Sequence, residues 1–194
     1  MAPAVPAPKS NRYWVVPAGR AFAALVLAAV ITFTRDTHTA EFGLIAFGVF
    51  AVVDGLVVAA LSAVFAPRGV TRILFVVQGV IGVVAGILAL ALMGSGLGLF
   101  LYLVTVWAAL TGCLELYSAL RSRGKDAAAR DWLVTGALTA LLALAFVFVP
   151  ADAVLAIGLL GAWAVVVGVF QAIGAASLRT ASRAQAADQG ATRA

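Results

Sequence analysis

Long apolar runs, separated by short polar or glycine-rich stretches, dominate the 194-residue chain. A helix needs about 20 apolar residues to cross the hydrocarbon core of a bilayer, whereas membrane β-strands would alternate apolar and polar positions. The runs have the length of helices and do not alternate. The pattern therefore predicts an all-α membrane protein with six transmembrane helices, at about residues 16–34, 42–66, 73–93, 99–120, 132–149 and 153–178.

Prolines and glycines mark the breaks between these runs. Pro17 suits the first turn of a helix, where its missing N–H is not needed, and Pro67 follows the second run. The cluster Gly94–Gly98 divides one apolar stretch into two helices, since clustered glycines favour turns. Pro150 ends the fifth run. Outside the spans we expect a disordered cytoplasmic tail at residues 1–15 and a loosely ordered cytoplasmic tail at residues 179–194.

The positions of Lys and Arg predict the orientation. Lys and Arg keep short loops on the cytoplasmic side of a membrane. Threading the six runs through a bilayer leaves only Arg35 of the thirteen basic residues on the outer side. We therefore expect both chain ends in the cytoplasm, as three tandem helical hairpins require. The expected cytoplasmic set is Lys9, Arg12, Arg20, Arg68, Arg72, Arg121, Arg123, Lys125, Arg130, Arg179, Arg183 and Arg193.

Composition supports the membrane class and narrows the partners. The chain is 64% hydrophobic and 11% charged, whereas soluble domains carry about 25% charged residues, so the lipid bilayer is the expected partner. The net charge of +5 lies in loops between apolar runs, which argues against nucleic acid. With one cysteine and one histidine, we expect no catalytic set, no metal and no cofactor. No small-molecule substrate is indicated, and association with itself or with other membrane proteins stays open.

The even-numbered helices share an internal repeat. Gly55, Gly112 and Gly168 form one column, and each is followed within about a dozen residues by an arginine. Such a repeat predicts three hairpins in parallel orientation and approximate threefold regularity. An aromatic residue precedes each glycine by five positions and an alanine by four: Phe50, Trp107 and Trp163, and Ala51, Ala108 and Ala164.

These segments resemble the repeated signature of HdeD-like bacterial membrane proteins. The resemblance rests on residues 47–55 and 159–168, on the sixth-helix ending Gly174–Arg179 and on the turn at Pro150. It spans about residues 20–180. The resemblance implies a six-helix protein of the bacterial inner membrane built of short repeats, with an association with acid resistance. The family has no agreed catalytic residues, so it assigns none here.

Asp54 is the most unusual polar residue in the predicted spans. It lies roughly 18 Å from the end of its helix, near the membrane midplane, where a charged Asp costs about 2.5–3.5 kcal/mol. We expect Arg20 to extend to the headgroups, which leaves no basic residue at the depth of Asp54. Asp54 should therefore be protonated or hydrogen-bonded. It is either a proton- or cation-responsive site or a structural contact between helices.

Four further residues complete the candidate intramembrane polar site with Asp54: Glu115, Gln78, Thr111 and Gln171. Glu115, Thr111 and Asp54 would form a polar path from the cytoplasm toward the midplane, but nothing continues it outward. Hydrogen bonds between helices contribute about 0.6 kcal/mol each, which suffices for packing.

Three other features have simple structural interpretations. We expect Gly82 and Gly86 to pack inside the bundle, Cys113 to be a small core residue and His38 to be solvated in the first outer loop.

The sequence leaves two functions open. The first is a non-enzymatic integral membrane protein, connected with acid or envelope stress tolerance through the resemblance. The alternative is a small proton-linked transporter or channel that uses Asp54 and Glu115. Proton flux into liposomes would separate the two.

Overall fold

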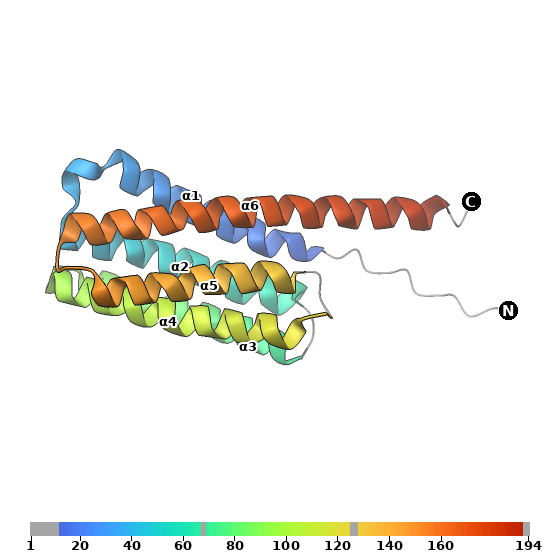
Figure 1. Cartoon of the computed structure of the whole chain (residues 1–194), viewed down its shortest axis with the longest axis horizontal. Helices are drawn as coiled ribbons and strands as arrows, with labels where there is room; N and C mark the ends of the chain where they lie inside the picture. The colour runs from blue at the N-terminus through green and yellow to red at the C-terminus, as the bar shows by residue number, and fades with distance from the viewer. Residues whose placement is uncertain (1–11, 67–68, 125–127, 192–194) are drawn as a thin grey trace.

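The computed structural model describes residues 12–66, 69–124 and 128–191, and all regular structure in this part of the chain is helical (Figure 1). Its α-helices are α1 (Val15–Phe33), α2 (Ala40–Phe65), α3 (Val70–Ala91), α4 (Leu97–Ser122), α5 (Ala129–Phe148) and α6 (Ala153–Ala191). Short 3-10 turns are η1 (Arg12–Trp14), η2 (Arg35–Thr37) and η3 (Met93–Ser95).

Each of these six α-helices is long and apolar enough to cross a membrane, so the predicted number of spans is confirmed for the described residues. The main difference lies at the C-terminus. Helix α6 continues to Ala191, so the segment expected to be loosely ordered is helical through that residue. At the N-terminus, η1 lies within the stretch expected to be disordered. Residues 1–11 and 192–194 are outside the described part.

Local chemistry explains several helix boundaries. Pro17 lies in the first turn of α1, as predicted. Gly96 precedes α4 with a φ of 83°, a left-handed conformation that glycine adopts without strain. Asp152 Oδ1 accepts a hydrogen bond of 2.7 Å from the backbone N–H of Leu155 and so caps the start of α6. Pro67, predicted to end the second span, lies outside the described residues.

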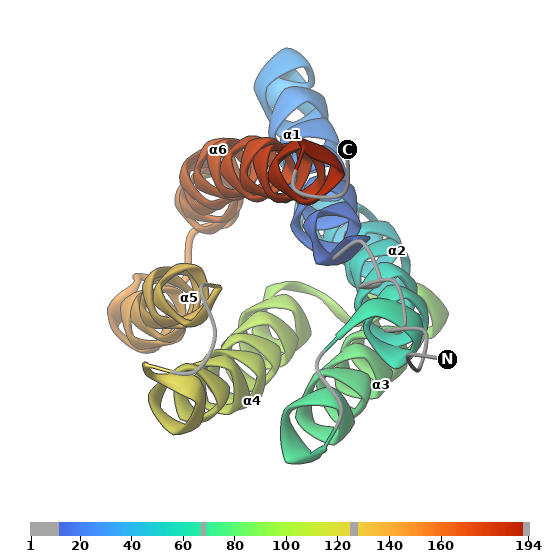
Figure 2. The same ribbon diagram turned by 90° about the vertical axis from the view of Figure 1, so that its right-hand side faces the viewer.

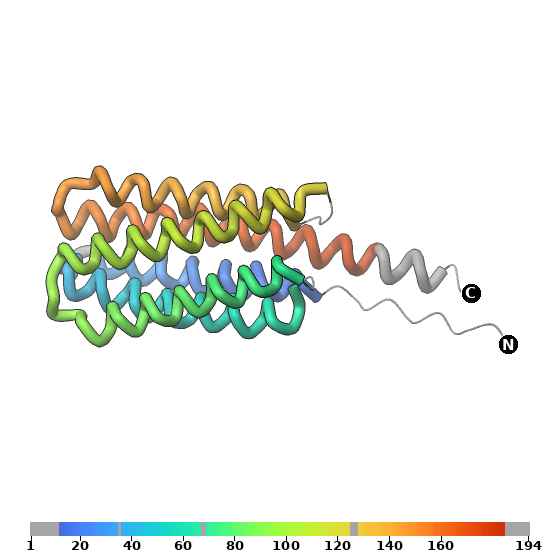
Figure 3. Tube along the Cα trace, turned by 90° about the horizontal axis from the view of Figure 1, so that it is seen from below, coloured from blue at the N-terminus to red at the C-terminus, as the bar shows by residue number. Residues whose placement is uncertain are grey.

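The helices form a ring, which is clearest when the bundle is viewed along its axis (Figure 2). The start of α1, the ends of α2 and α4 and the starts of α3 and α5 lie together at one end of the bundle, beyond which α6 projects (Figure 3). We call this the terminal end. The opposite end, where α1 meets α2, α3 meets α4 and α5 meets α6, is called the loop end.

The closest packing joins α2 to α3, α4 to α5 and α6 to α1. The repeated glycine lies in each of these interfaces. A Cβ atom on Gly55 would lie 2.6 Å from the Gly79 carbonyl oxygen, and one on Gly112 would lie 2.7 Å from the Ala140 nitrogen. A Cβ on Gly168 would lie 2.9 Å from Leu25 Cγ. The repeat therefore brings each even-numbered helix against the following helix around the ring, rather than against its predicted hairpin partner.

Gly82 and Gly86 also pack as predicted, on the same α2–α3 interface. A Cβ atom on Gly86 would lie 2.6 Å from the Gly48 carbonyl oxygen, and one on Gly82 would lie 3.1 Å from that of Ala51. Two other expectations are wrong. Cys113 is exposed on the outer face of α4 rather than buried in the core. His38 is partly buried, with Nε2 2.9 Å from the Ile31 carbonyl oxygen.

Three aromatic rings from equivalent repeat positions meet inside the ring of helices. Phe50 and Trp107 have centroids 5.8 Å apart, Phe50 and Trp163 5.8 Å, and Trp107 and Trp163 5.5 Å, all edge to face. This geometry is the favourable one for aromatic pairs. We call these residues the aromatic triad. On its loop-end side the interior is filled by fully buried apolar side chains, including Leu44, Phe100, Ile157 and Leu160.

Candidate functional site

A cluster of three charged side chains lies inside the bundle on the terminal side of the aromatic triad. Arg20 on α1 donates from Nη1 to Glu115 Oε1 on α4 over 2.6 Å. The Arg20 Nε atom lies 3.4 Å from Asp54 Oδ1 on α2. The side chains of Arg20 and Asp54 are 11% and 10% exposed, and that of Glu115 is 1% exposed. One guanidinium thus bridges two buried carboxylates from three different helices.

The pairing of Arg20 corrects two expectations from the sequence. The Arg20 side chain turns into the bundle instead of reaching the headgroups, and Asp54 does have a basic partner. Arg20 lies about 12 Å along its helix from Arg12, at 1.5 Å per residue. The long Arg20 side chain spans the remaining distance along the bundle to the Asp54 carboxylate. Removing a carboxylate from water is costly unless it is paired and hydrogen-bonded, which explains why Arg20 turns inward.

The other predicted polar residues are buried but do not join this cluster in the expected way. Thr111 donates its hydroxyl to the Trp107 carbonyl oxygen of its own helix, over 2.7 Å. It therefore does not link Glu115 to Asp54, and Arg20 makes that link instead. Gln78 is 4% exposed on α3, and its Oε1 atom has no hydrogen-bond partner among the described residues.

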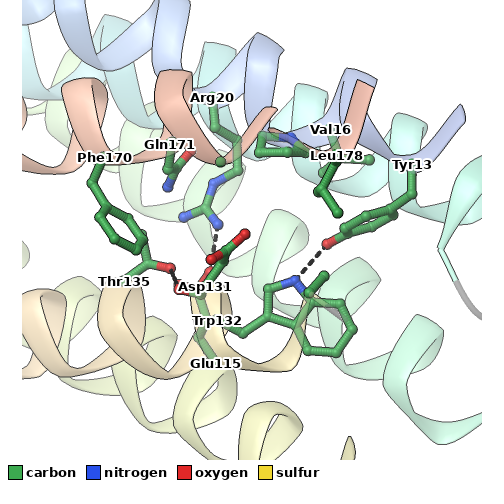
Figure 4. Close-up of a pocket in the computed structure, with 13 residues that line it drawn as sticks. Tyr13, Val16, Arg20, Glu115, Asp131, Trp132, Thr135, Phe170, Gln171 and Leu178 are labelled. Atoms are coloured by element: carbon green, nitrogen blue, oxygen red, sulfur yellow. Dashed lines mark hydrogen bonds and ion pairs between the residues drawn. The ribbon is translucent and has the colours of Figure 1, made fainter. Parts of the chain in front are cut away.

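Gln171 lines a small cavity beside the cluster, together with Arg20 and Glu115 (Figure 4). The cavity measures about 20 Å³, which is room for one water molecule. Two buried oxygen atoms among its lining residues, Glu115 Oε2 and Gln171 Oε1, lack a hydrogen-bond partner in the described part of the chain. Thr135 and Asp131 of α5 also line it. A chamber with polar groups in its lining therefore adjoins the charged side chains of Arg20 and Glu115.

Tyr13 and Trp132 line the same cavity nearer the terminal end (Figure 4). Trp132 Nε1 donates a hydrogen bond of 2.7 Å to Tyr13 Oη, and the two rings meet edge to face. Both side chains are buried. This contact joins η1 to α5 on the terminal-end side of the cavity.

Sequence reasoning missed Arg20 and Asp131 as members of the site. The predicted fifth span starts at residue 132 and so leaves Asp131 out, but α5 begins at Ala129 and includes it. The available signal was its spacing from Thr135, because residues four apart lie on the same face of a helix. For Arg20 the only signal was that it lies within the first predicted span, four residues after its start.

The arrangement can hold a proton or a water molecule, but it does not extend across the bundle. The aromatic triad adjoins the cluster, since Phe50 lies one helical turn from Asp54 toward the loop end. The side chains that fill the interior beyond the triad are apolar. The polar chamber is thus confined to the half of the bundle nearer the terminal end.

Fold and site together define the class: an all-helical, multi-pass membrane protein with a charged cluster buried in one half of its bundle. Residues 77–149 match the family model described as a short repeat of unknown function (DUF308), the repeat found in HdeD-like membrane proteins. The match covers most of α3 and all of α4 and α5, so it includes Glu115 but neither Arg20 nor Asp54. No curated protein and no solved structure matches the chain.

Proposed function

We propose that the chain is a non-enzymatic protein of the bacterial inner membrane whose buried charge cluster takes up one proton when the cytoplasm acidifies. Its role would be in acid or envelope stress tolerance, as the resemblance to HdeD-like proteins implies; the repeat matched over residues 77–149 is one of unknown function. The observation that carries the proposal is the sharing of one guanidinium by two buried carboxylates.

Counting charges gives the reason for proton uptake. Asp54 and Glu115 together carry two negative charges when ionised, and Arg20 supplies one positive charge. The remaining negative charge is buried, which costs several kcal/mol unless it is compensated. One proton on the carboxylate pair removes it. Glu115 Oε2, without a partner among the described residues and beside the small cavity, is the atom best placed to receive that proton.

The proposed orientation places the terminal end of the bundle in the cytoplasm, with both chain ends there and three tandem hairpins crossing the membrane. Arg72, Arg121, Arg123 and Arg130 lie at helix ends of this side, and Arg179 of α6 lies beside Trp14, which precedes α1, in keeping with the positive-inside rule. The chamber beside Glu115 would then be reached from the cytoplasm, past Tyr13 and Trp132.

The alternative, a proton-linked transporter or channel using Asp54 and Glu115, requires a route through the other half of the bundle. The aromatic triad and the apolar side chains beyond it argue against such a route. We therefore favour proton binding without proton transfer across the membrane.

Reconstitution into liposomes that contain a pH-sensitive dye separates the two functions. We expect no proton flux above that of empty liposomes, while infrared spectra of the same sample gain a protonated carboxylic acid band on acidification. That band should be lost in Glu115→Gln or Asp54→Asn and kept in Glu41→Gln, a control at an exposed acid. Flux that disappears in Asp54→Asn would support the transporter. A spectrum insensitive to Asp54→Asn and Glu115→Gln would contradict proton uptake.

A further inference from the structure

A second cavity opens at the terminal end, between the end of α4 and the start of α5, and measures about 380 Å³. Two arginines, Arg123 and Arg130, line it, and no acidic residue of the described chain does. The other described residues that line it are apolar or contribute backbone: Ala119, Leu120, Gly124, Ala129 and Leu133. A pocket of this composition combines an anion-binding rim with an apolar wall.

Arg123 and Arg130 make fewer contacts than two other arginines of this end. The charge of Arg130 does act on the adjacent Asp131 carboxylate. Arg72 donates to the Ala66 carbonyl oxygen over 2.7 and 3.3 Å, and Arg179 lies 4.9 Å from the centre of the Trp14 ring. Arg123 and Arg130 make no ion pair or hydrogen bond with any described residue. Two guanidinium groups on one cavity repel each other, and each presents a fork of donors that matches a phosphate.

The start of α5 adds to the positive potential of this cavity. Helix α5 begins at Ala129, so its N-terminal end lies beside the cavity, next to Arg130. The N-terminal end of a helix carries partial positive charge and favours anions. This effect and the two arginines act on the same small region.

The order of polar and apolar residues along the cavity matches a phospholipid. Leu120 precedes Arg123 by three residues on α4, and Leu133 follows Arg130 by three residues on α5, about 4.5 Å in each case. Because α4 and α5 run in opposite directions (Figure 3), both leucines lie deeper in the candidate spans than the arginines do. One candidate span ends at Ser122 and the next begins at Ala129, so both arginines lie at span ends, where lipid headgroups are expected.

We propose that this cavity binds the headgroup phosphate of an anionic phospholipid. Arg123 and Arg130 hold the phosphate, and Leu120 and Leu133 contact the glycerol and the upper part of an acyl chain. A soluble phosphate ester offers the same anionic chemistry, but it would leave the apolar wall uncovered. The site is separate from the charge cluster and does not depend on proton uptake.

The test is native mass spectrometry of the full chain in neutral detergent. The protein is titrated with phosphatidylglycerol and, separately, with phosphatidylcholine that carries the same acyl chains. We expect one phosphatidylglycerol to bind more tightly than any phosphatidylcholine. Arg123→Gln/Arg130→Gln should weaken that binding at least about tenfold, the effect of losing a hydrogen bond to a charged group. The matched control, Arg12→Gln/Arg183→Gln, removes two exposed charges of the same end that do not line the cavity.

Three results would overturn the proposal. The first is equal binding of the two lipids, and the second is an equal loss of binding in the site and control variants. The third is binding of glycerol 3-phosphate as tight as that of the lipid, which would make a soluble phosphate ester the ligand. Arg123 and Arg130 are exposed, so their substitution should leave the fold intact. Arg123→Gln alone, with Arg183→Gln as its control, repeats the comparison if the double variant is unstable.

Discussion

Replacing Arg20 by Gln should destabilise the bundle more than any other single change of a charged residue. The substitution removes the guanidinium that binds Asp54 and Glu115, whose side chains are only 10% and 1% exposed. Removing one partner of a buried ion pair costs about 3–5 kcal/mol, because the remaining charge stays buried without compensation. Here two carboxylates lose their common partner, so the upper part of that range is expected.

Unfolding in mixed detergent micelles, followed by fluorescence of the buried tryptophans Trp107, Trp132 and Trp163, measures this loss. Arg183→Gln removes an exposed arginine of α6 and should change the free energy of unfolding by less than about 0.5 kcal/mol. The cost of Arg20→Gln should increase as the pH rises, because both carboxylates then stay charged without a counter-ion. Adding Glu115→Gln to Arg20→Gln should recover part of the loss, since one buried charge is then removed.

The reasoning would be refuted if Arg20→Gln cost no more than Arg183→Gln, or if the cost did not depend on pH. A double-mutant cycle between Arg20 and Glu115 gives a second criterion. A coupling energy near zero would mean that the contact of 2.6 Å between Nη1 and Oε1 contributes nothing to folding.

Three further predictions follow from packing and orientation. Gly55→Ala should lower the free energy of unfolding by about 1–3 kcal/mol, because its Cβ would lie 2.6 Å from the Gly79 carbonyl oxygen. Gly158→Ala, whose Cβ would have no atom within 4 Å, should leave it unchanged. Equal effects of the two substitutions in an unfolding assay would contradict the glycine interface. Trp163→Ala should lower the free energy of unfolding by about 3–5 kcal/mol. Liposomes that contain this variant should stay proton-tight, since the apolar side chains beyond the triad remain, and a proton leak measured with a pH-sensitive dye would argue against a closed loop-end half. A reporter fused after Ala194 should be active only if it is a type that works in the cytoplasm, and activity of a periplasmic type would reverse the orientation.

The helices and their packing glycines were predictable because their signals are local. Run length gives the number of spans, and Gly94–Gly98 and Pro150 interrupt apolar runs by their own backbone chemistry. The column of Gly55, Gly112 and Gly168 indicated a repeat. It did not show which neighbouring helix each glycine faces. The contact of α6 with α1, for example, joins helices from opposite ends of the chain, and the spacing of the repeat does not reveal it.

The charge cluster was only half predictable. The sequence places Asp54 and Glu115 at their depths, since depth follows from position along a helix. The direction of the Arg20 side chain depends on which helices surround it, and a single sequence does not give this. The same limit applies to Asp131, whose position in the cavity depends on how α5 packs between α4 and α6.

The most direct test of the central claim is a solid-state NMR measurement on the full chain in lipid bilayers. Dipolar couplings would be measured from the ¹⁵N-labelled guanidinium of Arg20 to ¹³C-labelled Asp and Glu carboxylates and to lipid ³¹P. Inward pairing predicts a strong coupling to the carboxylates, including one lost in Glu115→Gln, and none to phosphorus. Coupling of Arg20 to lipid phosphorus, with none to either carboxylate, would contradict a buried charge cluster.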